Sequence, residues 1–378
     1  MKNNKTIEIL KQLISIPSWV NQKTNEAKIG NWIMDFLKKN TKLKIIKQNI
    51  GKGRFNIIAQ NSKNVDVLVT GHIDTVQPNS GWTKNPVRPE TNGDRLYGLG
   101  SSDMKSGIAI MLYLATLPDL SKNTSFLFYC DEEYDFLGMR KFILEYKNKI
   151  KPRSVISLDG DGLQITNSCR GLIEMKVTVQ GKAGHAARPT SGINAITQSQ
   201  KVINKLNRWL KNYSSKELGS STLNIAYIKG GTKIGNKNNE ILLGQEGNVI
   251  ADYCEYIVEI RVANEKLNAN LVKKFITENS EKLGLKIIEI KIRHDLGSWI
   301  TPMEKMKEII SLAPKKKLRS AKESGYLDIQ MIWQTFGKVL TFSLGAGEPG
   351  QAHKADEYVK MSEVLKAQKF FETILANK

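Results

Sequence analysis

The sequence predicts an α/β protein, in which a mostly parallel sheet with helices on both faces carries an inserted ferredoxin-like (βαββαβ) α+β unit. Two observations predict this fold. Helical and strand patterns alternate in the first and last parts of the chain, as in a parallel sheet with crossover helices. Between these parts the order changes to strand, helix, strand, strand, helix, strand. We therefore expect a discontinuous domain, residues 1–168 and 297–378, and an insert, residues 169–296.

The first and last parts supply the helices and strands of the larger domain. Four segments are predicted to be helical, namely residues 7–14, 29–37, 106–117 and 362–375. Four apolar, β-prone runs are predicted to be strands, namely residues 65–70, 124–130, 154–158 and 339–344. Ligand sites of open α/β sheets lie beyond the carboxyl ends of the strands, so we expect the functional residues there.

The insert has its own order of elements. Its predicted strands are residues 172–179, 222–228, 252–262 and 285–293, and its predicted helices are residues 193–210 and 265–283. Five apolar residues at helical spacing give the first of these helices one apolar face: Ile193, Ile196, Ile203, Leu206 and Leu210. The Gly-rich and Asn-rich stretch over 230–247 is expected to be a long loop.

The composition is that of an ordinary globular protein with more than one domain. Of the 378 residues, 40% are hydrophobic and 25% are charged, which excludes a disordered tail, a collagen and a disulfide scaffold. The cysteines Cys130, Cys169 and Cys254 do not cluster, so we expect small buried side chains in a reducing compartment. The N-terminal segment lacks the apolar run of a secretory signal, and the longest apolar stretch, residues 108–117, is too short to span a membrane. We expect a cytoplasmic protein with no membrane partner.

The net charge of +20 raises the question of an anionic partner. Most lysines are scattered, and the two dense basic runs, residues 147–153 and 315–319, have no interleaved aromatic residues for base stacking. We therefore predict no nucleic-acid partner. The excess charge is interpreted as solvated surface, with attraction of acidic substrates as the lesser alternative.

His72 and Asp74 follow the predicted strand over 65–70. They are two residues apart, so an extended backbone points both side chains to one face, where the Asp74 carboxylate can orient the His72 imidazole. This arrangement favours a metal ligand. The alternative is a His–Asp pair that only caps a turn.

Acidic residues mark two further loops. Asp103 precedes the predicted helix over 106–117, where it could bridge two metal ions or simply cap the helix. Asp131, Glu132 and Glu133 follow the predicted strand over 124–130. Because adjacent side chains point in opposite directions, this run could supply one metal ligand and one general base. The alternative is a solvated acidic loop.

Two more loops complete the inventory. Asp159 and Asp161 follow the predicted strand over 154–158, and His353 lies in the Gly-rich loop after the last strand. One histidine and one unshared carboxylate per ion, with a third carboxylate shared, suit two Zn²⁺ or similar ions that activate a water between them.

Four motifs now resemble those of the M20 metallopeptidase family, which includes carboxypeptidase G-like enzymes, acetylornithine deacetylase, succinyl-diaminopimelate desuccinylase and peptidase T. The motifs are Gly-His-Ile-Asp-Thr-Val at 71–76, Ser-Asp-Met-Lys at 102–105, Asp-Glu-Glu at 131–133 and His-Lys-Ala-Asp-Glu-Tyr at 353–358. They match in order and spacing, and the resemblance covers nearly the whole chain. It implies a metallohydrolase with a catalytic domain and a lid or dimerisation insert.

The resemblance also implies a role for each site residue. His72 and Asp159 would bind one ion, Glu133 and His353 the other, and Asp103 both. Glu132 would be the general base that takes a proton from the attacking water and delivers it to the leaving amine. Asp74 would orient His72.

Residues of the insert match family positions as well. His185, in Gly-His-Ala-Ala-Arg-Pro at 184–189, would stabilise the oxyanion in a partner's active site, which requires a homodimer. Asn248 and Arg261 would hold the substrate, the arginine through a carboxylate. Ser324 and Gly325 lie in a segment that resembles the loop completing the substrate pocket.

The sequence leaves several alternatives open. Asp161 rivals Asp159 as a ligand, and the Asp-Gly setting of Asp159 is closer to the tripeptidase pattern than to the Glu-Pro of deacylases. We expect hydrolysis of a small peptide, as by an exopeptidase, or of an N-acyl amino acid, as by a deacylase. Zn²⁺ is the expected metal, with Co²⁺ or Mn²⁺ as alternatives. A non-catalytic binding protein that retains the fold is the alternative of a different class.

Overall fold

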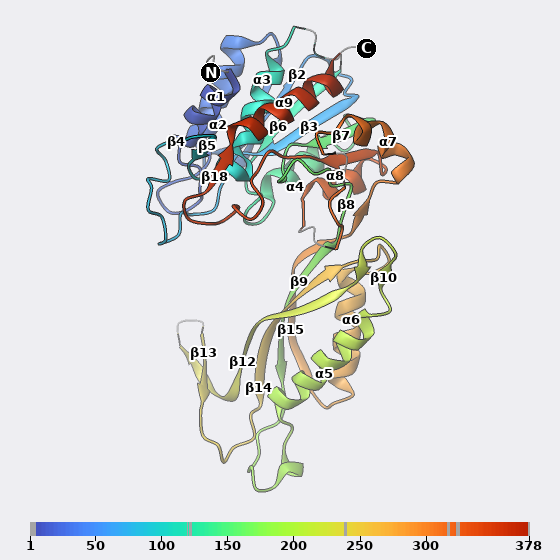
Figure 1. Ribbon diagram of the computed structural model, residues 1–378. Coiled ribbons are helices and arrows are strands. Elements are labelled where there is room, and N and C mark those ends of the chain that lie inside the picture. The colour runs from blue at the N-terminus through green and yellow to red at the C-terminus, as the bar shows by residue number, and fades with distance from the viewer. Residues whose placement is uncertain are drawn as a thin grey trace. The chain divides into compact units, whose positions relative to one another are not determined.

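The computed structural model describes residues 5–118, 120, 123–237, 240–315, 318–322 and 326–376. The chain forms two compact units (Figure 1), each with its own hydrophobic core. The first unit comprises residues 1–167, 300–320 and 327–378, and the second comprises residues 168–299 and 321–326.

The first unit is built on a six-stranded sheet. Its strands, in spatial order, are β1 (Lys44–Gly51), β2 (Arg54–Gln60), β6 (Thr124–Tyr129), β3 (Val67–His72), β7 (Ser154–Ser157) and β17 (Leu340–Ser343). The pairs β6–β3, β3–β7 and β7–β17 are parallel, whereas β1–β2 and β2–β6 are antiparallel. The predicted α/β class with a parallel-rich sheet is therefore confirmed.

Helices cover both faces of this sheet (Figure 1). The helices of this unit are α1 (Lys5–Ile14), α2 (Ala27–Asn40), α3 (Ser106–Ala115), α4 (Leu137–Tyr146), α7 (Met303–Leu312), α8 (Ile329–Thr335) and α9 (Met361–Leu375). Phe126 and Phe128 of β6 join the core formed with α1, α2, α3 and α9. Tyr129, the residue after Phe128, points to the other face, where it meets the start of α8. Because both faces of the sheet are covered, β6 is buried at every position.

The carboxyl ends of the parallel strands meet at one edge of the sheet. His72 ends β3, Glu132 and Glu133 follow β6, Asp159 follows β7, and the loop after β17 carries His353. A three-stranded sheet lies in the same unit and comprises β4 (Glu90–Asn92), β5 (Arg95–Tyr97) and β18 (Tyr358–Lys360). The segment that carries Asp103 connects β5 to α3.

The second unit contains an antiparallel sheet with the order β13-β12-β14-β9-β15. Its elements along the chain are β9 (Gly171–Gln180), α5 (Ala195–Leu210), β12 (Thr222–Lys237), β13 (Glu240–Gly244), β14 (Tyr253–Val262), α6 (Ala269–Glu281) and β15 (Lys286–Leu296). Apart from β13, this is the βαββαβ order expected from the sequence. Two short pairs complete the strands, namely β10 (Ser214–Ser215) with β11 (Gly219–Ser220) and β8 (Ser168–Cys169) with β16 (Trp299–Ile300).

The prediction of a long loop over residues 230–247 is wrong for most of that stretch, which forms a β-hairpin. β12 continues to Lys237 and pairs with β13 as a hairpin, with a bulge between Lys233 and Gly235. Gly and Asn, which suggested a loop, are tolerated here because much of the hairpin is solvent-exposed: Ile234 exposes 66% of its surface. The turn itself, residues 238–239, lies outside the described residues.

The structure also bears on the cysteines and on the apolar helices. Cys130, Cys169 and Cys254 are all free and buried, as predicted. Within the described residues, no helix combines the length and the apolar character that crossing a bilayer requires.

Candidate active site

His72 is the most enclosed of the predicted ligands, with 1% of its surface exposed. Its Nε2 lies 3.1 Å from Oδ1 of Asp103, and its Nδ1 lies 3.1 Å from the backbone oxygen of Asp74. A carbonyl oxygen can only accept, so Nδ1 carries a proton and Nε2 is the nitrogen that faces the other acidic residues. Burial lowers the pKa of His72, but hydrogen bonds to Asp103 and Asp74 outweigh it and hold the pKa well above its ordinary value.

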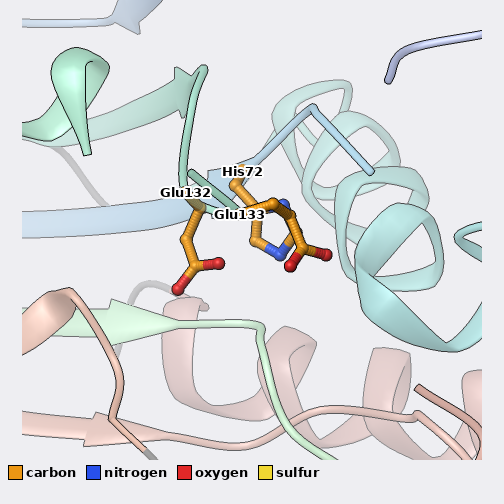
Figure 2. A group of neighbouring side chains, drawn as sticks. All are labelled: His72, Glu132 and Glu133. Atoms are coloured by element: carbon orange, nitrogen blue, oxygen red, sulfur yellow. The ribbon is translucent and has the colours of Figure 1, made fainter. Parts of the chain in front are cut away.

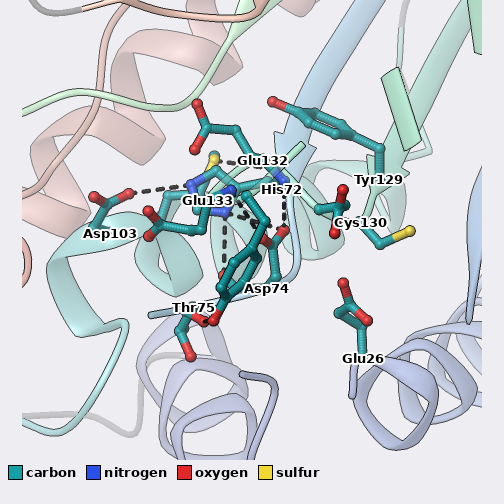
Figure 3. Close-up of polar contacts among 12 residues, drawn as sticks. Glu26, His72, Asp74, Thr75, Asp103, Tyr129, Cys130, Glu132 and Glu133 are labelled. Carbon is teal, nitrogen blue, oxygen red and sulfur yellow. Dashed lines mark hydrogen bonds and ion pairs between the residues drawn. The ribbon is translucent and has the colours of Figure 1, made fainter. Parts of the chain in front are cut away.

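Asp74 contacts both His72 and the loop after β6 (Figure 3). One carboxylate oxygen lies 3.6 Å from Nδ1 of His72. The same carboxylate accepts the backbone N–H of Glu132 at 3.1 Å and that of Glu133 at 3.0 Å. Asp74 therefore fixes the two glutamates relative to the histidine, which is more than the imidazole-orienting role expected from the sequence.

Asp131 shapes the turn that presents the glutamates. Its φ is +73°, and its carboxylate accepts the backbone N–H groups of Asp135 and Leu137, at 3.2 and 3.1 Å. Arg54 pairs with this carboxylate and also binds Glu26 through two bonds, of 2.8 and 2.6 Å. As a result, Glu132 and Glu133 both come to lie beside the His72 ring (Figure 2).

The described residues form three groups of potential metal ligands. One is His72, Glu132 and Glu133, and the other two share Asp103. In each of these two groups, the ligand atoms all lie within 4.8 Å of one another: His72, Asp103 and Asp159 in one, and Asp103, Glu133 and His353 in the other. In the second group, Nε2 of His353 lies 2.9 Å from a carboxylate oxygen of Glu133 and 3.6 Å from one of Asp103. Each group offers one imidazole and two carboxylates, a donor set that suits Zn²⁺ and similar ions.

The structure distinguishes Asp159 from its rival Asp161. Asp161 pairs with Arg319, and it belongs to no potential ligand group among the described residues. Asp159 lies with His72 and Asp103 instead, and its backbone N–H donates to the Ser157 hydroxyl at 3.1 Å. The geometry therefore favours Asp159.

Burial and neighbouring groups shift the pKa values of the site residues. Burial raises the pKa of Glu132 well above its usual range, and the nearby His72 offsets only part of this. Burial, reinforced by the charge of Asp103, raises the pKa of Asp159 to about 7. The hydrogen bond to Glu133 raises the pKa of His353 to about 9. Carboxylates that are buried close together repel one another and lose their hydration, and bound cations offset both effects. The donor set therefore fits two bound divalent ions.

Asp328 was not predicted as a site residue. It lies at the start of α8 with 4% of its surface exposed, and it accepts a hydrogen bond from the Tyr129 hydroxyl at 2.8 Å. Its Oδ2 is buried and has no hydrogen-bond partner among the described residues. Burial raises the pKa of Asp328 to about 7. No local pattern could have revealed this pair, because the two residues are 199 positions apart.

In the second unit, His185 and Asn248 lie side by side on two exposed loops. His185 forms a backbone bridge with Val249, and the N–H of Ala186 donates to the backbone oxygen of Asn248 at 2.8 Å. The side chain of His185 is exposed, and its Nδ1 accepts the N–H of Ala187 at 3.1 Å.

The other predicted substrate residues lie elsewhere. Arg261 is near the opposite end of β14, where its Nε donates to Glu259 at 2.7 Å. Ser324 and Gly325 lie outside the described residues.

The sequence profile of peptidase family M20/M25/M40 matches residues 68–377. The chain belongs to this family. Acetylornithine deacetylase of Buchnera aphidicola from Schizaphis graminum is 27% identical over 98% of this chain and 97% of its own. The family resemblance inferred from the four sequence motifs is therefore confirmed, and the protein is a hydrolase of the peptidase and amidohydrolase type.

Solved structures of the family share the fold of this chain. An M20 family metallo-carboxypeptidase from Sulfolobus solfataricus superposes with a TM-score of 0.75 and 17% identity, covering 98% of both chains. A dinuclear metal-binding M20 peptidase from Bacillus subtilis superposes with a TM-score of 0.68 and 14% identity, covering 98% of this chain and 97% of its own.

Proposed function

We propose that this family member hydrolyses an amide bond of a small peptide or an N-acyl amino acid with two divalent metal ions. The observation that carries the proposal is the pair of ligand groups joined through Asp103. His72 and Asp159 would hold one ion, Glu133 and His353 the other, and Asp103 both. Zn²⁺ is the proposed metal, with Co²⁺ or Mn²⁺ as alternatives. The ions would supply Lewis acidity and an acidified water.

Glu132 is the proposed general base. Its side chain lies beside His72 and Glu133, and Asp74 accepts its backbone N–H. Its carboxylate is not one of the ligands proposed above for either ion. The raised pKa of Glu132 makes its carboxylate a stronger proton acceptor than an exposed glutamate. It would take a proton from the attacking water and give it to the leaving amine. Asp74 would keep Nδ1 of His72 protonated and its ring oriented.

The substrate class has two candidates. A relative that matches over 98% of this chain is named an acetylornithine deacetylase, which favours an N-acyl amino acid. The Asp-Gly setting of Asp159 and the metallo-carboxypeptidase neighbour favour a peptide instead. Arg261 would bind a carboxylate in either case.

A homodimer is part of the proposal because the predicted substrate residues of the second unit lie at opposite ends of its sheet. Asn248 precedes β14, whereas Arg261 is the ninth residue of that ten-residue strand. A strand rises about 3.3 Å per residue, so the two ends are on the order of 25 Å apart. One small substrate cannot contact both residues of the same chain. His185 and Asn248 would therefore serve the active site of a partner subunit.

A Glu132→Gln variant tests the general base. It preserves shape and removes the proton acceptor, so we expect at least a 100-fold loss of kcat with two ions still bound per chain. Glu145→Gln is the matched control and should keep full activity. Glu145 is a half-buried residue of α4 that pairs with Lys141 and accepts from Gln48, from which a glutamine can still accept. Undiminished turnover by Glu132→Gln would refute the assignment.

A panel of dipeptides, tripeptides and N-acetyl or N-succinyl amino acids, assayed with metal-loaded protein, identifies the substrate class. Cleavage confined to the acyl amino acids would assign a deacylase, and cleavage confined to peptides an exopeptidase. No cleavage of any substrate by protein with two bound ions would point to an unusual amide substrate outside the panel.

Since all three cysteines are free and buried, we propose that the enzyme works in the reducing cytoplasm.

Mixing inactive His185→Ala and Glu132→Gln subunits tests the homodimer. A mixed dimer would contain one site with both an intact base and an intact histidine, so activity should partly return. No recovery in verified mixed dimers would count against action of His185 across subunits.

A further inference from the structure

The Glu357 carboxylate accepts three backbone N–H groups from the segment that carries Asp103. Oε2 accepts Gly100 at 2.8 Å, and Oε1 accepts Ser102 at 2.7 Å and Asp103 at 3.1 Å. Glu357 itself exposes only 2% of its surface. A carboxylate can accept several hydrogen bonds at once, and bonds to an ionised acceptor are stronger than those between neutral groups.

The Asp103 segment depends on this acceptor because it is not regular. Gly100 has a φ of +78°, and Asp103 has a φ of −128° and a ψ of 99°, so neither residue has helical geometry. Buried N–H groups that no helix or sheet satisfies need another partner. Glu357 provides that partner for the backbone N–H of Asp103 itself.

Further contacts attach the Asp103 segment to the chain around Glu357. The Ser102 hydroxyl donates to the backbone oxygen of Tyr358 at 2.8 Å and accepts the N–H of Glu348 at 2.8 Å. The N–H of Gly98 donates to the backbone oxygen of Glu357 at 2.9 Å. Glu348 and Glu357 flank His353 in the same loop. The contacts therefore connect the loop that carries Asp103 to the loop that carries His353.

We propose that Glu357 is a positioning residue, which holds the Asp103 carboxylate where it can serve both metal ions and keeps it in register with His353. This inference rests on the proposed two-metal function. The Glu357 carboxylate binds backbone N–H groups, and Glu357 belongs to none of the potential ligand groups among the described residues. The affinity for the ions therefore depends on the buried Glu357 carboxylate, although Glu357 belongs to neither of the ligand groups that share Asp103.

Glu357→Gln tests the proposal. The amide keeps the size of the side chain, but one of its two ends then directs an N–H₂ group at backbone N–H groups and cannot accept from them. The matched control is Asp356→Asn. The neighbouring Asp356 carboxylate also accepts backbone N–H groups, from Thr83 at 2.9 Å and Lys84 at 3.0 Å, but those residues hold no proposed ligand.

The measurement is the affinity of metal-free protein for Zn²⁺ by equilibrium dialysis, together with the thermal midpoint of the metal-free protein. We expect Glu357→Gln to bind Zn²⁺ at least 10-fold more weakly and to regain turnover as Zn²⁺ is raised. Asp356→Asn should match the wild type in both respects. A purely structural role would lower the midpoint without changing the affinity of the folded fraction.

Wild-type affinity in folded Glu357→Gln would overturn the proposal. If that variant does not fold, Glu357→Asp replaces it, because the shorter side chain cannot reach all three N–H groups. Failure of both variants to fold would also overturn the proposal, in favour of a role in folding alone. Failure of the two-metal function is a different result, since the wild-type protein itself would then bind no pair of ions.

Discussion

Asp74, Asp131 and Glu357 are acids whose oxygens accept backbone N–H groups, so they shape turns. Glu133 and Asp159 belong instead to the groups of potential metal ligands. In the sequence Asp131 and Glu133 are alike, because both belong to one acidic run after a strand. The structure separates them by what their oxygens contact. A charge change is therefore expected to act on ion binding directly in the second set, and only through the geometry of the turns in the first.

Asp328 gives a pH-dependent prediction for the metal-free protein. Its pKa rises from an ordinary value of 3.8 to about 7 on folding, so between these values the folded state binds more protons than the unfolded state. Stability contributed by this group is then lost as the pH rises through that window. Asn cannot ionise, yet it can still accept from the Tyr129 hydroxyl. Asp328→Asn should therefore gain stability relative to the wild type as the pH rises from 5 to 8.

The expected gain across that pH range is roughly 1–2 kcal/mol, less than the full shift would give. The measurement is urea unfolding at pH 5 and pH 8 in the presence of a chelator. Asp66→Asn is a control, because that carboxyl is far more exposed and is paired with Arg153 at the surface. A gain for Asp328→Asn that is equal at both pH values would contradict the raised pKa.

At the scale of the elements, α4 packs its first turn against the end of β6. A Cβ atom added at Gly138 would lie 2.2 Å from the backbone oxygen of Cys130 and 2.6 Å from Oδ1 of Asn56. Hydrogen bonds hold both atoms in place: the Cys130 oxygen accepts the N–H of Gly138 at 3.1 Å, and Oδ1 of Asn56 accepts the N–H of Cys130 at 3.2 Å. Gly138→Ala should therefore displace the turn that carries Glu132, because that turn begins directly after Cys130.

We expect Gly138→Ala to cost about 1–3 kcal/mol of stability and to lower kcat as well. Chemical denaturation and steady-state kinetics measure the two effects. Gly235→Ala is the matched control, since an added Cβ would meet nothing within 4 Å there. Equal stability of the two variants would show that the end of β6 can adjust to the helix.

The elements that could be predicted from the sequence are those with a local signal. β3, β6, β7 and β17 are apolar runs, and all four lie where the sequence places them. The β1–β2 hairpin was missed because polar residues interrupt both strands. Arg54 and Asn56 are buried in β2 only because distant partners satisfy them: Glu26 for Arg54, and the backbone oxygen of Gly138 for Asn56.

In the candidate site too, the residues that could be predicted are those with a local sequence signal. His72, Asp103 and Glu133 could be identified because each belongs to a short sequence motif. Asp328 could not be identified, because its partner Tyr129 reaches it through the fold. Glu357 belongs to a recognised motif, but its role depends on backbone N–H groups more than 250 residues away in the chain.

At the scale of the whole molecule, the two units have separate hydrophobic cores. The core of the first unit draws on helices from both ends of the chain, such as α1 and α9. The core of the second unit lies between its sheet and α5 and α6. The potential metal ligands all belong to the first unit, whereas His185 belongs to the second. We therefore propose that the units unfold separately and that bound metal stabilises only the first.

Removing the metal tests this proposal. A ligand present at about 1,000 times its Kd adds roughly 4 kcal/mol of stability, which corresponds to a midpoint shift of about 10 °C for a unit of this size. Calorimetry of the Zn²⁺-loaded chain should show two transitions, and a chelator should lower one by about that amount. The other transition should stay fixed and coincide with that of a fragment comprising residues 168–299. If the chelator moves both transitions equally, the units unfold as one, and metal binding stabilises the insert as well as the sheet that holds the ligands.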